Sequence, residues 1–257
     1  GVTHVIRGDD HLNNTFRQNI IYDAMNWDKP TYAHLPLILG PDGSKMSKRH
    51  GAASVEEYRD MGYLPAALRN YLLRLGWSHG DDEIISDEQA KEWFDLSGCN
   101  KAAARFDFAK LESLNAHYIK ETENGELLAR CLPLYEEKLG KPLSEQAQSM
   151  VLACMDELKS RAKTLVQIVD ESSFFGNETA TPDEEARAML DTEEAQQVLT
   201  DLPALMKNLE DWTSGSIMDL CKSYANENLG GKLGKVGMPL RAKITGRKQS
   251  PGIFHVC

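Results

Sequence analysis

The hydrophobic pattern of this 257-residue chain changes once, near Gly51, and this change restricts the folds that the chain can adopt. Before that point the pattern predicts a strand at residues 3–6, a helix that begins at Thr15, and a second strand at residues 35–39. Thr15 and Gln18 have the spacing of a capping box with Thr15 as the N-cap. A strand, a helix and a strand at this spacing predict a βαβ unit in a parallel sheet, where ligands bind beyond the carboxyl ends of the strands.

Beyond Gly51 the apolar residues recur at helical spacing. Short helices are predicted at residues 55–61, 65–75, 87–95 and 108–118. Apolar residues three or four apart from Val151 to Val169 predict one long helix, and the capping box at Thr181–Glu184 predicts the start of another. Further apolar spacing after Leu202 predicts two or three more. The expected fold class is therefore mainly α, with a small α/β part at the beginning.

The net charge of -10 excludes a uniformly basic nucleic-acid-binding protein, but the charges are unevenly distributed. Acidic side chains outnumber basic ones over residues 121–229, whereas residues 230–257 carry six basic and no acidic side chains. Because salt screens charges over about 10 Å, a local basic segment can bind phosphate even in an acidic protein.

Cysteine usage and hydropathy restrict the class of protein further. The five cysteines are widely separated and odd in number, which argues against a disulfide framework and favours the cytoplasm. The spacing of cysteines and histidines predicts no zinc site and no other metal site. No apolar run approaches the roughly 20 residues of a membrane span. Both ends interrupt an apolar pattern, so we expect a fragment of a larger enzyme, long enough for two domains.

The segment Lys45–Arg49 carries the strongest chemical signal. It places two lysines three residues apart, with a hydroxyl and a third cation, on a loop bounded by glycine and proline. Mobile positive charges and hydrogen-bond donors are what a triphosphate requires, so this loop points to ATP chemistry. Taken alone, such a string is also compatible with a basic turn exposed to solvent.

Five other segments make an ordinary basic turn a weaker explanation of this loop. Together with the loop they resemble bacterial glutamyl-tRNA synthetases, which are class I aminoacyl-tRNA synthetases. The segments are His4–Leu12, Tyr32–Pro36, His50–Gly51, Ser54–Tyr58 and Leu72–Trp77. The specific motifs lie within residues 1–120, and residues 121–257 resemble the family more loosely.

The resemblance implies a domain organisation and an activity. Residues 1–51 would be the C-terminal part of the nucleotide-binding catalytic fold, a truncated Rossmann-like remnant. Residues 52–120 would be a stem-contact region, and residues 121–257 an all-α anticodon-binding domain that is truncated at its C-terminus. The intact enzyme would use ATP and Mg to convert glutamate into glutamyl adenylate and then transfer it to the terminal ribose of tRNA(Glu). The family's His-x-x-His motif is absent here, so this chain alone should be inactive.

The resemblance also assigns roles to single residues. Lys45, Ser47 and Lys48 would bind the β- and γ-phosphates of ATP and stabilise the leaving pyrophosphate, with Asp10 and His11 close to the ATP. Arg7, at a predicted strand end, would bind the side-chain carboxylate of glutamate. Arg49 would also bind ATP. Two of these roles have alternatives. Arg7 could instead form an ion pair with Asp9 or Asp10, and Arg49 could instead pair with a carboxylate or contact the tRNA.

The basic segment near the C-terminus resembles a part of the family close to its anticodon-binding region. Its cations would contact the tRNA backbone, and six such contacts would give a salt slope of roughly -4 to -5. They are Lys232, Lys235, Arg241, Lys243, Arg247 and Lys248. A basic loop that faces the acidic helices is the alternative.

Three other interpretations are compatible with parts of the sequence: two are enzymes, and the third is a binding module. Glutaminyl-tRNA synthetase is one, although that family continues with β-barrels whereas the second half of this chain is helical. A truncated relative that glutamylates a modified tRNA base is a second, but it lacks an anticodon-binding domain. A tRNA-binding module without catalysis is a third. The sequence leaves open whether the parent enzyme also charges the glutamine tRNA. The resemblance alone implies that the parent enzyme is a monomer.

Overall fold

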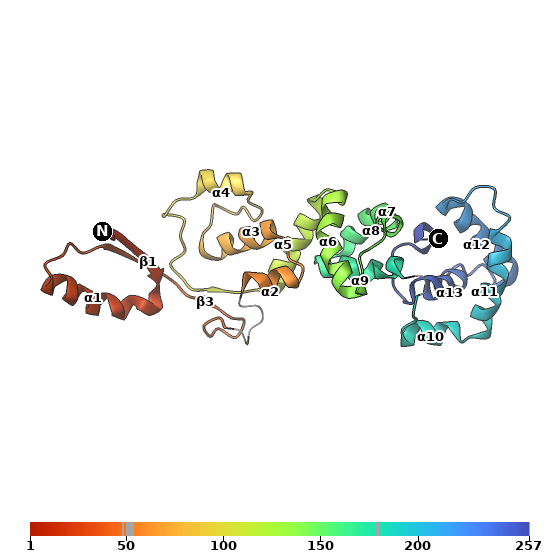
Figure 1. The fold of residues 1–257 in the computed structure, drawn as a ribbon, viewed down its shortest axis with the longest axis horizontal. Coiled ribbons are helices and arrows are strands. Elements are labelled where there is room, and N and C mark those ends of the chain that lie inside the picture. Colours follow the sequence, from red (N-terminus) through yellow and green to blue (C-terminus); the bar gives the residue numbers. More distant parts are fainter. Residues whose placement is uncertain (48, 50–53, 178–179, 257) are drawn as a thin grey trace. The chain divides into compact units, whose positions relative to one another are not determined.

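The computed structural model describes residues 1–47, 49, 54–177 and 180–256. The chain forms two compact units, Gly1–Tyr118 and Ile119–Cys257. Figure 1 shows helices along most of the chain, and the strands of the described residues all lie in the first unit. The prediction of a mainly helical chain is confirmed. Among these residues no helix is both long and apolar enough to span a membrane.

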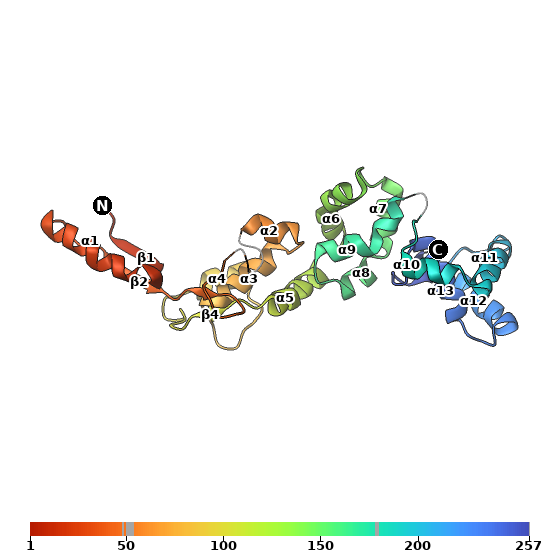
Figure 2. The same cartoon turned by 90° about the horizontal axis from the view of Figure 1, so that it is seen from below.

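The first unit opens with a parallel strand pair. Strand β1 (His4–Gly8) pairs with β2 (Thr31–Leu35) in a register that runs from His4↔Thr31 to Gly8↔Leu35. Helix α1 (Leu12–Ala24) connects them after a 3-10 turn at Asp9–His11, and Figure 2 shows α1 lying along the strands. The βαβ prediction is confirmed.

Two details of that prediction are wrong. Helix α1 begins at Leu12, because the 3-10 turn leads directly into it, and Thr15 therefore lies inside the helix. The second strand was expected at residues 35–39, but β2 ends at Leu35 and a separate short strand, β3 (Ile38–Leu39), follows it.

Helix α1 leaves its apolar side exposed. Phe16, Ile20 and Ile21 are 65%, 68% and 57% exposed, and no residue of α1 is buried. Apolar side chains in a row on one helix face normally pack against another element. This face is therefore an unpartnered surface in the described part of the chain.

The rest of the first unit is helical around an aromatic core. Its helices are α2 (Val55–Asp60), α3 (Pro65–Gly76), α4 (Asp87–Trp93) and α5 (Phe108–Glu121), and β4 (Ala104–Arg105) pairs in parallel with β3. Capping boxes at Ser54/Glu57 and Ser86/Gln89 fix the starts of α2 and α4. The four helices predicted here from the apolar spacing are confirmed. Their core contains Tyr58, Tyr63, Leu68, Tyr71, Leu75, Phe106, Leu111 and Leu114.

A buried asparagine joins two of these helices. Asn115 on α5 is fully buried, and its Oδ1 accepts a hydrogen bond of 2.8 Å from the backbone N–H of Leu64, the N-cap residue of α3. We expect Asn115→Ala to lower the free energy of unfolding by about 2 kcal/mol, because it leaves a buried donor without a partner. Urea unfolding followed by tryptophan fluorescence, together with hydrogen exchange at the Leu64 amide, measures the effect. The exposed Asn100 supplies the control variant Asn100→Ala, and equal behaviour of the two variants would refute the expectation.

The second unit begins with a bundle formed by α6 (Asn124–Leu139), α7 (Glu145–Ala153), α8 (Met155–Arg161) and α9 (Leu165–Ser172), followed by a 3-10 turn at Ser173–Gly176. The single helix predicted from Val151 to Val169 is wrong, since the chain bends at Cys154 and becomes extended at Ala162. Thr164 then caps α9 by accepting a hydrogen bond from the Gln167 amide. The predicted apolar stripe is nevertheless buried throughout, so the burial was predicted correctly and the continuity was not.

The remaining helices of the second unit enclose a separate core. They are α10 (Glu184–Leu190), α11 (Glu193–Met206), α12 (Ser214–Asn228), α13 (Gly234–Thr245) and α14 (Ile253–Val256). The predicted N-cap Thr181 is wrong, because Asp183 caps α10 with a carboxylate that accepts from the Ala186 amide at 2.8 Å. Val198, Leu202, Ile217, Cys221 and Val236 are among the buried residues of this core.

Candidate active site

Arg7 is held at the carboxyl end of β1 by residues from two other elements, α1 and β2. Its Nη2 donates to Thr15 Oγ1 on α1 at 2.8 Å, and its Nε donates to His34 Nε2 on β2 at 3.3 Å. The guanidinium carbon lies 5.5 Å from the centre of the Tyr32 ring. The strand register, which pairs Arg7 with His34, produces this arrangement.

Within the described residues, Arg7 does not form the ion pair with Asp9 or Asp10 that was the alternative to its predicted role in binding glutamate. Its hydrogen bonds go to Thr15 and His34, and among the described residues Arg7 forms no ion pair with Asp9 or Asp10. Because Arg7 Nε–H donates to it, His34 Nε2 must carry a lone pair. An arginine held by neutral groups keeps its full charge available for an anionic ligand.

The Lys45 side chain meets the end of β1 at Asp10. Lys45 Nζ donates to Asp10 Oδ2 at 2.8 Å, although the two residues are far apart in the sequence. The hydrogen bond from Lys45 is the main cause that lowers the pKa of the Asp10 carboxyl below its ordinary value. Gly8 makes room for this carboxylate, because a Cβ at Gly8 would lie 2.5 Å from Asp10 Oδ1.

The contact between Lys45 and Asp10 answers one prediction about the sheet edge. Because ligands bind beyond the carboxyl ends of parallel strands, we expected the Arg7–His11 segment and the Lys45 loop at one common edge. The contact brings the two segments together, although the Lys45 loop follows β3, which pairs with β4 in a second sheet. His11 lies beside the pair, with Nε2 3.9 Å from Asp10 Oδ1 and Nδ1 3.1 Å from the Asn14 amide.

A tight turn shapes the loop after β3. The Gly40 amide donates to the Ser44 carbonyl at 2.8 Å, and Gly43 adopts a φ of 80° that L side chains rarely adopt. The Asp42 carboxylate accepts hydrogen bonds from the Ser44 amide and hydroxyl at 2.9 and 2.8 Å. Met46 packs against the aromatic core of the first unit and so fixes the C-terminal side of the turn.

The other residues predicted for this loop have different positions. Arg49 donates to Ser44 Oγ at 2.8 Å and lies 3.6 Å from Asp42 Oδ2, so it pairs with a carboxylate within the loop. Ser47 is exposed. Lys48, the remaining catalytic candidate, lies outside the described residues.

Sequence reasoning gave no role to Thr15, Tyr32 or His34, although they surround Arg7. Tyr32 and His34 belong to a segment that was used only for the resemblance, and Thr15 was assigned to a helix cap. Their alternation along β2 was the signal that could have identified them, because residues two apart on a strand share one face.

The basic segment near the C-terminus is helical and partly neutralised. Residues 234–245 of it form α13, which packs against α10 and α11, so the segment is not the loop that the alternative interpretation assumed. Lys235 pairs with Glu194 at 2.6 Å, and Lys248 lies 3.5 Å from Glu185. Their side chains are therefore engaged with the acidic helices, as in the alternative interpretation.

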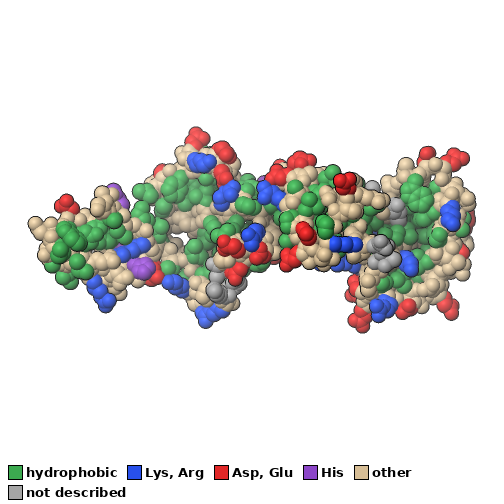
Figure 3. All heavy atoms as spheres, viewed as in Figure 1, with side chains coloured by type: hydrophobic (Ala, Val, Ile, Leu, Met, Phe, Trp, Pro, Cys, Tyr) green, Lys and Arg blue, Asp and Glu red, His purple; other side chains and the backbone are tan. Residues whose placement is uncertain are grey.

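Three cations of the segment have neither an acidic partner nor a side-chain hydrogen bond among the described residues, namely Lys232, Lys243 and Arg247. The sixth, Arg241, donates from Nε to Ser250 Oγ at 3.1 Å. Figure 3 shows basic and acidic side chains interspersed over the second unit on the face in view. The number of cations available to an RNA backbone is thus smaller than the composition indicates.

Two family models match the chain. The model for "tRNA synthetases class I (E and Q), catalytic domain" matches residues 1–113, and the model for "Anticodon binding domain" matches residues 108–257. The chain therefore belongs to the class I tRNA synthetase family of glutamate and glutamine.

Individual relatives agree with the glutamate branch of that family. The chain is 53% identical over 257 residues to glutamate–tRNA ligase 2 of Rhodospirillum centenum and 50% identical to that of Paramagnetospirillum magneticum. Each match covers 100% of this chain and 54% of the relative. The resemblance to glutamyl-tRNA synthetases predicted from the sequence is confirmed.

A solved structure supports the fold. The crystal structure of a glutamate tRNA ligase from Elizabethkingia meningosepticum, in complex with its amino acid, matches with a TM-score of 0.79 and 30% identity. The match covers 99% of this chain and 53% of that chain. The chain thus spans about half the length of the relatives it matches.

Proposed function

We propose that this chain is part of a glutamate–tRNA ligase that activates glutamate with ATP and transfers it to tRNA(Glu). The observation that carries the proposal is the contact of Lys45 with Asp10, which brings the Lys45 loop to the turn that follows Arg7 at the end of β1. Glutamate requires a cation for its side-chain carboxylate, and ATP requires mobile cations for its phosphates. Arg7 would supply the cation for the glutamate carboxylate, and Lys45 would supply a cation for the phosphates.

The proposed roles follow this geometry. Arg7 binds the side-chain carboxylate of glutamate, held in place by Thr15 and His34. Lys45, Ser47 and Lys48 bind the β- and γ-phosphates of MgATP, the substrate, and stabilise the charge that develops as pyrophosphate leaves. Asp10, His11 and Arg49 border the nucleotide, with Arg49 shared between ATP and Asp42.

The proposed domains divide the work. Residues 1–51 are the C-terminal part of the catalytic nucleotide-binding fold, residues 52–120 contact the tRNA stem, and residues 121–257 bind the anticodon region. The exposed apolar side of α1 supports the first assignment, because a larger catalytic fold would cover it. The chain alone would bind tRNA without completing aminoacylation, which makes a tRNA-binding module the second candidate function. We further propose a cytoplasmic, monomeric parent enzyme.

Binding of this chain to tRNA(Glu), and to a tRNA with a different anticodon, across a salt series tests the proposal. The three cations that have neither an acidic partner nor a side-chain hydrogen bond predict a salt slope of about -2 to -3 from the second unit, smaller in magnitude than six contacts would give. We expect Lys243→Gln to reduce that slope by about 0.9 and the ion-paired Lys235→Gln to change it less. Equal and weak binding to both tRNAs would reject the anticodon assignment.

A further inference from the structure

Arg74 on α3 lacks the partners that a buried guanidinium normally has. Its Nε and Nη1 are enclosed by protein atoms and have no hydrogen-bond partner in the described ranges. Enclosing charged donors without acceptors is costly, so such groups usually pair with a carboxylate, a water or a ligand. The arrangement indicates that Arg74 is poised for an acceptor from outside the chain.

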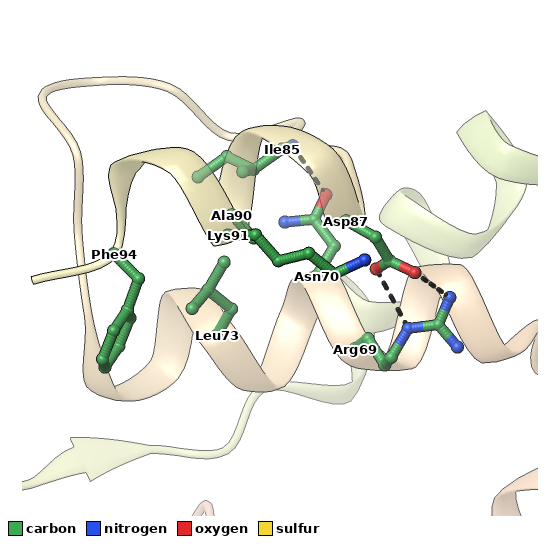
Figure 4. A pocket seen from close by; sticks show the side chains of 8 residues that line it. All are labelled: Arg69, Asn70, Leu73, Ile85, Asp87, Ala90, Lys91 and Phe94. Carbon is green, nitrogen blue, oxygen red and sulfur yellow. Dashed lines mark hydrogen bonds and ion pairs between the residues drawn. The ribbon is translucent and has the colours of Figure 1, made fainter.

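A second arginine on the same helix shows the usual arrangement. Arg69 donates from Nε and Nη2 to the two carboxylate oxygens of Asp87 at 3.0 and 2.5 Å (Figure 4). It lines a cavity of about 540 Å³, where the buried Asn70 amide is bonded to the Ile85 and Glu83 backbone. The Arg69 guanidinium and the Asn70 amide in that cavity already have partners, so neither group calls for an anion from outside.

The cavity beside Arg74 is small, and its basic side chains outnumber its one acidic side chain. Its volume is about 130 Å³, and Arg74 of α3 and Lys110, Ser113 and His117 of α5 lie along its wall. Glu83 is the carboxylate that faces them, and its Oε1 accepts from Lys110 Nζ at 2.8 Å. Two permanent cations and a titratable imidazole therefore surround one carboxylate, which leaves an excess of positive charge and a hydroxyl donor.

This set of donors fits a phosphate group. A phosphate presents several acceptor oxygens to donors that converge from different sides, and arginine and lysine are its usual protein partners. A cavity of about 130 Å³ has room for one phosphate group but not for a nucleoside. A bound group would therefore enter as a phosphate projecting from a larger molecule that stays outside.

We propose that Arg74, Lys110 and His117 form a binding site for one phosphate of an RNA backbone. The proposal rests on the proposed function, which supplies the RNA. Arg74 donates to the phosphate oxygens, Lys110 is shared between the phosphate and Glu83, and Ser113 adds a neutral donor. The site lies in the first unit, so it is separate from the cations of α13.

The test compares tRNA(Glu) binding by this chain and by matched variants across a salt series. We expect Arg74→Gln to weaken binding about tenfold and to reduce the magnitude of the salt slope by about 0.7 to 0.9, because one phosphate contact is lost. Arg69→Gln makes the same chemical change on the same helix, but at a paired arginine, and we expect an unchanged slope. Glu83→Gln removes the competing carboxylate and should strengthen binding about threefold.

Each outcome is decisive. If the Arg74 variants bind tRNA(Glu) with the affinity and salt slope of the unmodified chain, the phosphate site is overturned but the proposed function stands. If the unmodified chain does not bind tRNA(Glu), the proposed function itself is rejected. If Arg74→Gln does not fold, Lys110→Gln and Glu83→Gln decide, since both positions are exposed. Inorganic phosphate is titrated separately, with the Arg74 Nε–H followed by NMR. A response to phosphate without any effect of the variants on RNA binding overturns the RNA assignment and leaves a site for the free ion.

Discussion

Replacing Arg7 with glutamine in the complete ligase will raise the KM for glutamate about 100-fold. The substitution removes the positive charge that faces the substrate carboxylate, and an unpaired carboxylate in a partly buried site costs about 3 kcal/mol. Arg7→Lys keeps the charge but loses the planar fork, so we expect an intermediate effect of about tenfold. ATP–pyrophosphate exchange at varied glutamate concentration measures both.

The Arg7 prediction has a built-in control. Arg17→Gln changes an exposed arginine on α1 and should leave the KM for glutamate unchanged. His34→Ala removes the acceptor of Arg7 Nε without touching the proposed substrate contact, and should therefore raise the KM less than Arg7→Gln does. If Arg7→Gln instead lowered kcat at an unchanged KM, Arg7 would not bind the ground-state carboxylate.

Replacing Lys45 with alanine will lower the rate of glutamate activation about 100-fold or more. The proposed role of Lys45 is to stabilise charge that develops on the phosphates in the transition state, and removal of one preorganised donor of this kind has effects of that size. Unlike the Arg7 variants, Lys45→Ala should lower kcat and leave the KM for glutamate nearly unchanged. Lys29, an exposed lysine paired with Asp23, provides the control Lys29→Ala.

The same variant gives a readout in this chain without catalysis. The Lys45 hydrogen bond holds the pKa of Asp10 below its ordinary value, so Lys45→Ala should raise that pKa toward the value of a free aspartate. Carbon NMR of the Asp10 carboxyl during an acid titration measures the change. An Asp10 titration that stays the same would show that the contact does not persist in solution.

The local structure near Ser54 and Ser86 was predictable because short-range signals determine it. Each of these serines has a glutamate or glutamine three residues later, and each begins a helix as the capping-box rule requires. Thr15 and Gln18 have the same spacing but no cap, because the chain is already turning at Asp9 when it enters α1. A local motif is overruled when the helix has been nucleated upstream of it.

Other features depend on distances that a sequence does not contain. The stripe from Val151 to Val169 keeps a helical period although the chain is extended at Ala162, because the bends preserve the face that points to the core. Hydrophobic spacing therefore predicted burial and not continuity. The sequence does not show which residues bond Arg7, that Lys235 pairs with Glu194, or that two enclosed Arg74 nitrogens have no hydrogen-bond partner among the described residues, because these features arise only when the chain folds.

In the proposed ATP site, the contact of Lys45 with Asp10 would make the Lys45 loop selective among anions. The lysine already has an internal carboxylate as a partner, so an incoming anion has to compete with a tethered negative charge that is always present at high local concentration. A singly charged ion such as chloride or acetate gains little by replacing that carboxylate. A polyphosphate, which brings several charges at once, displaces it readily, and the loop is thereby shielded from the abundant small anions of its surroundings.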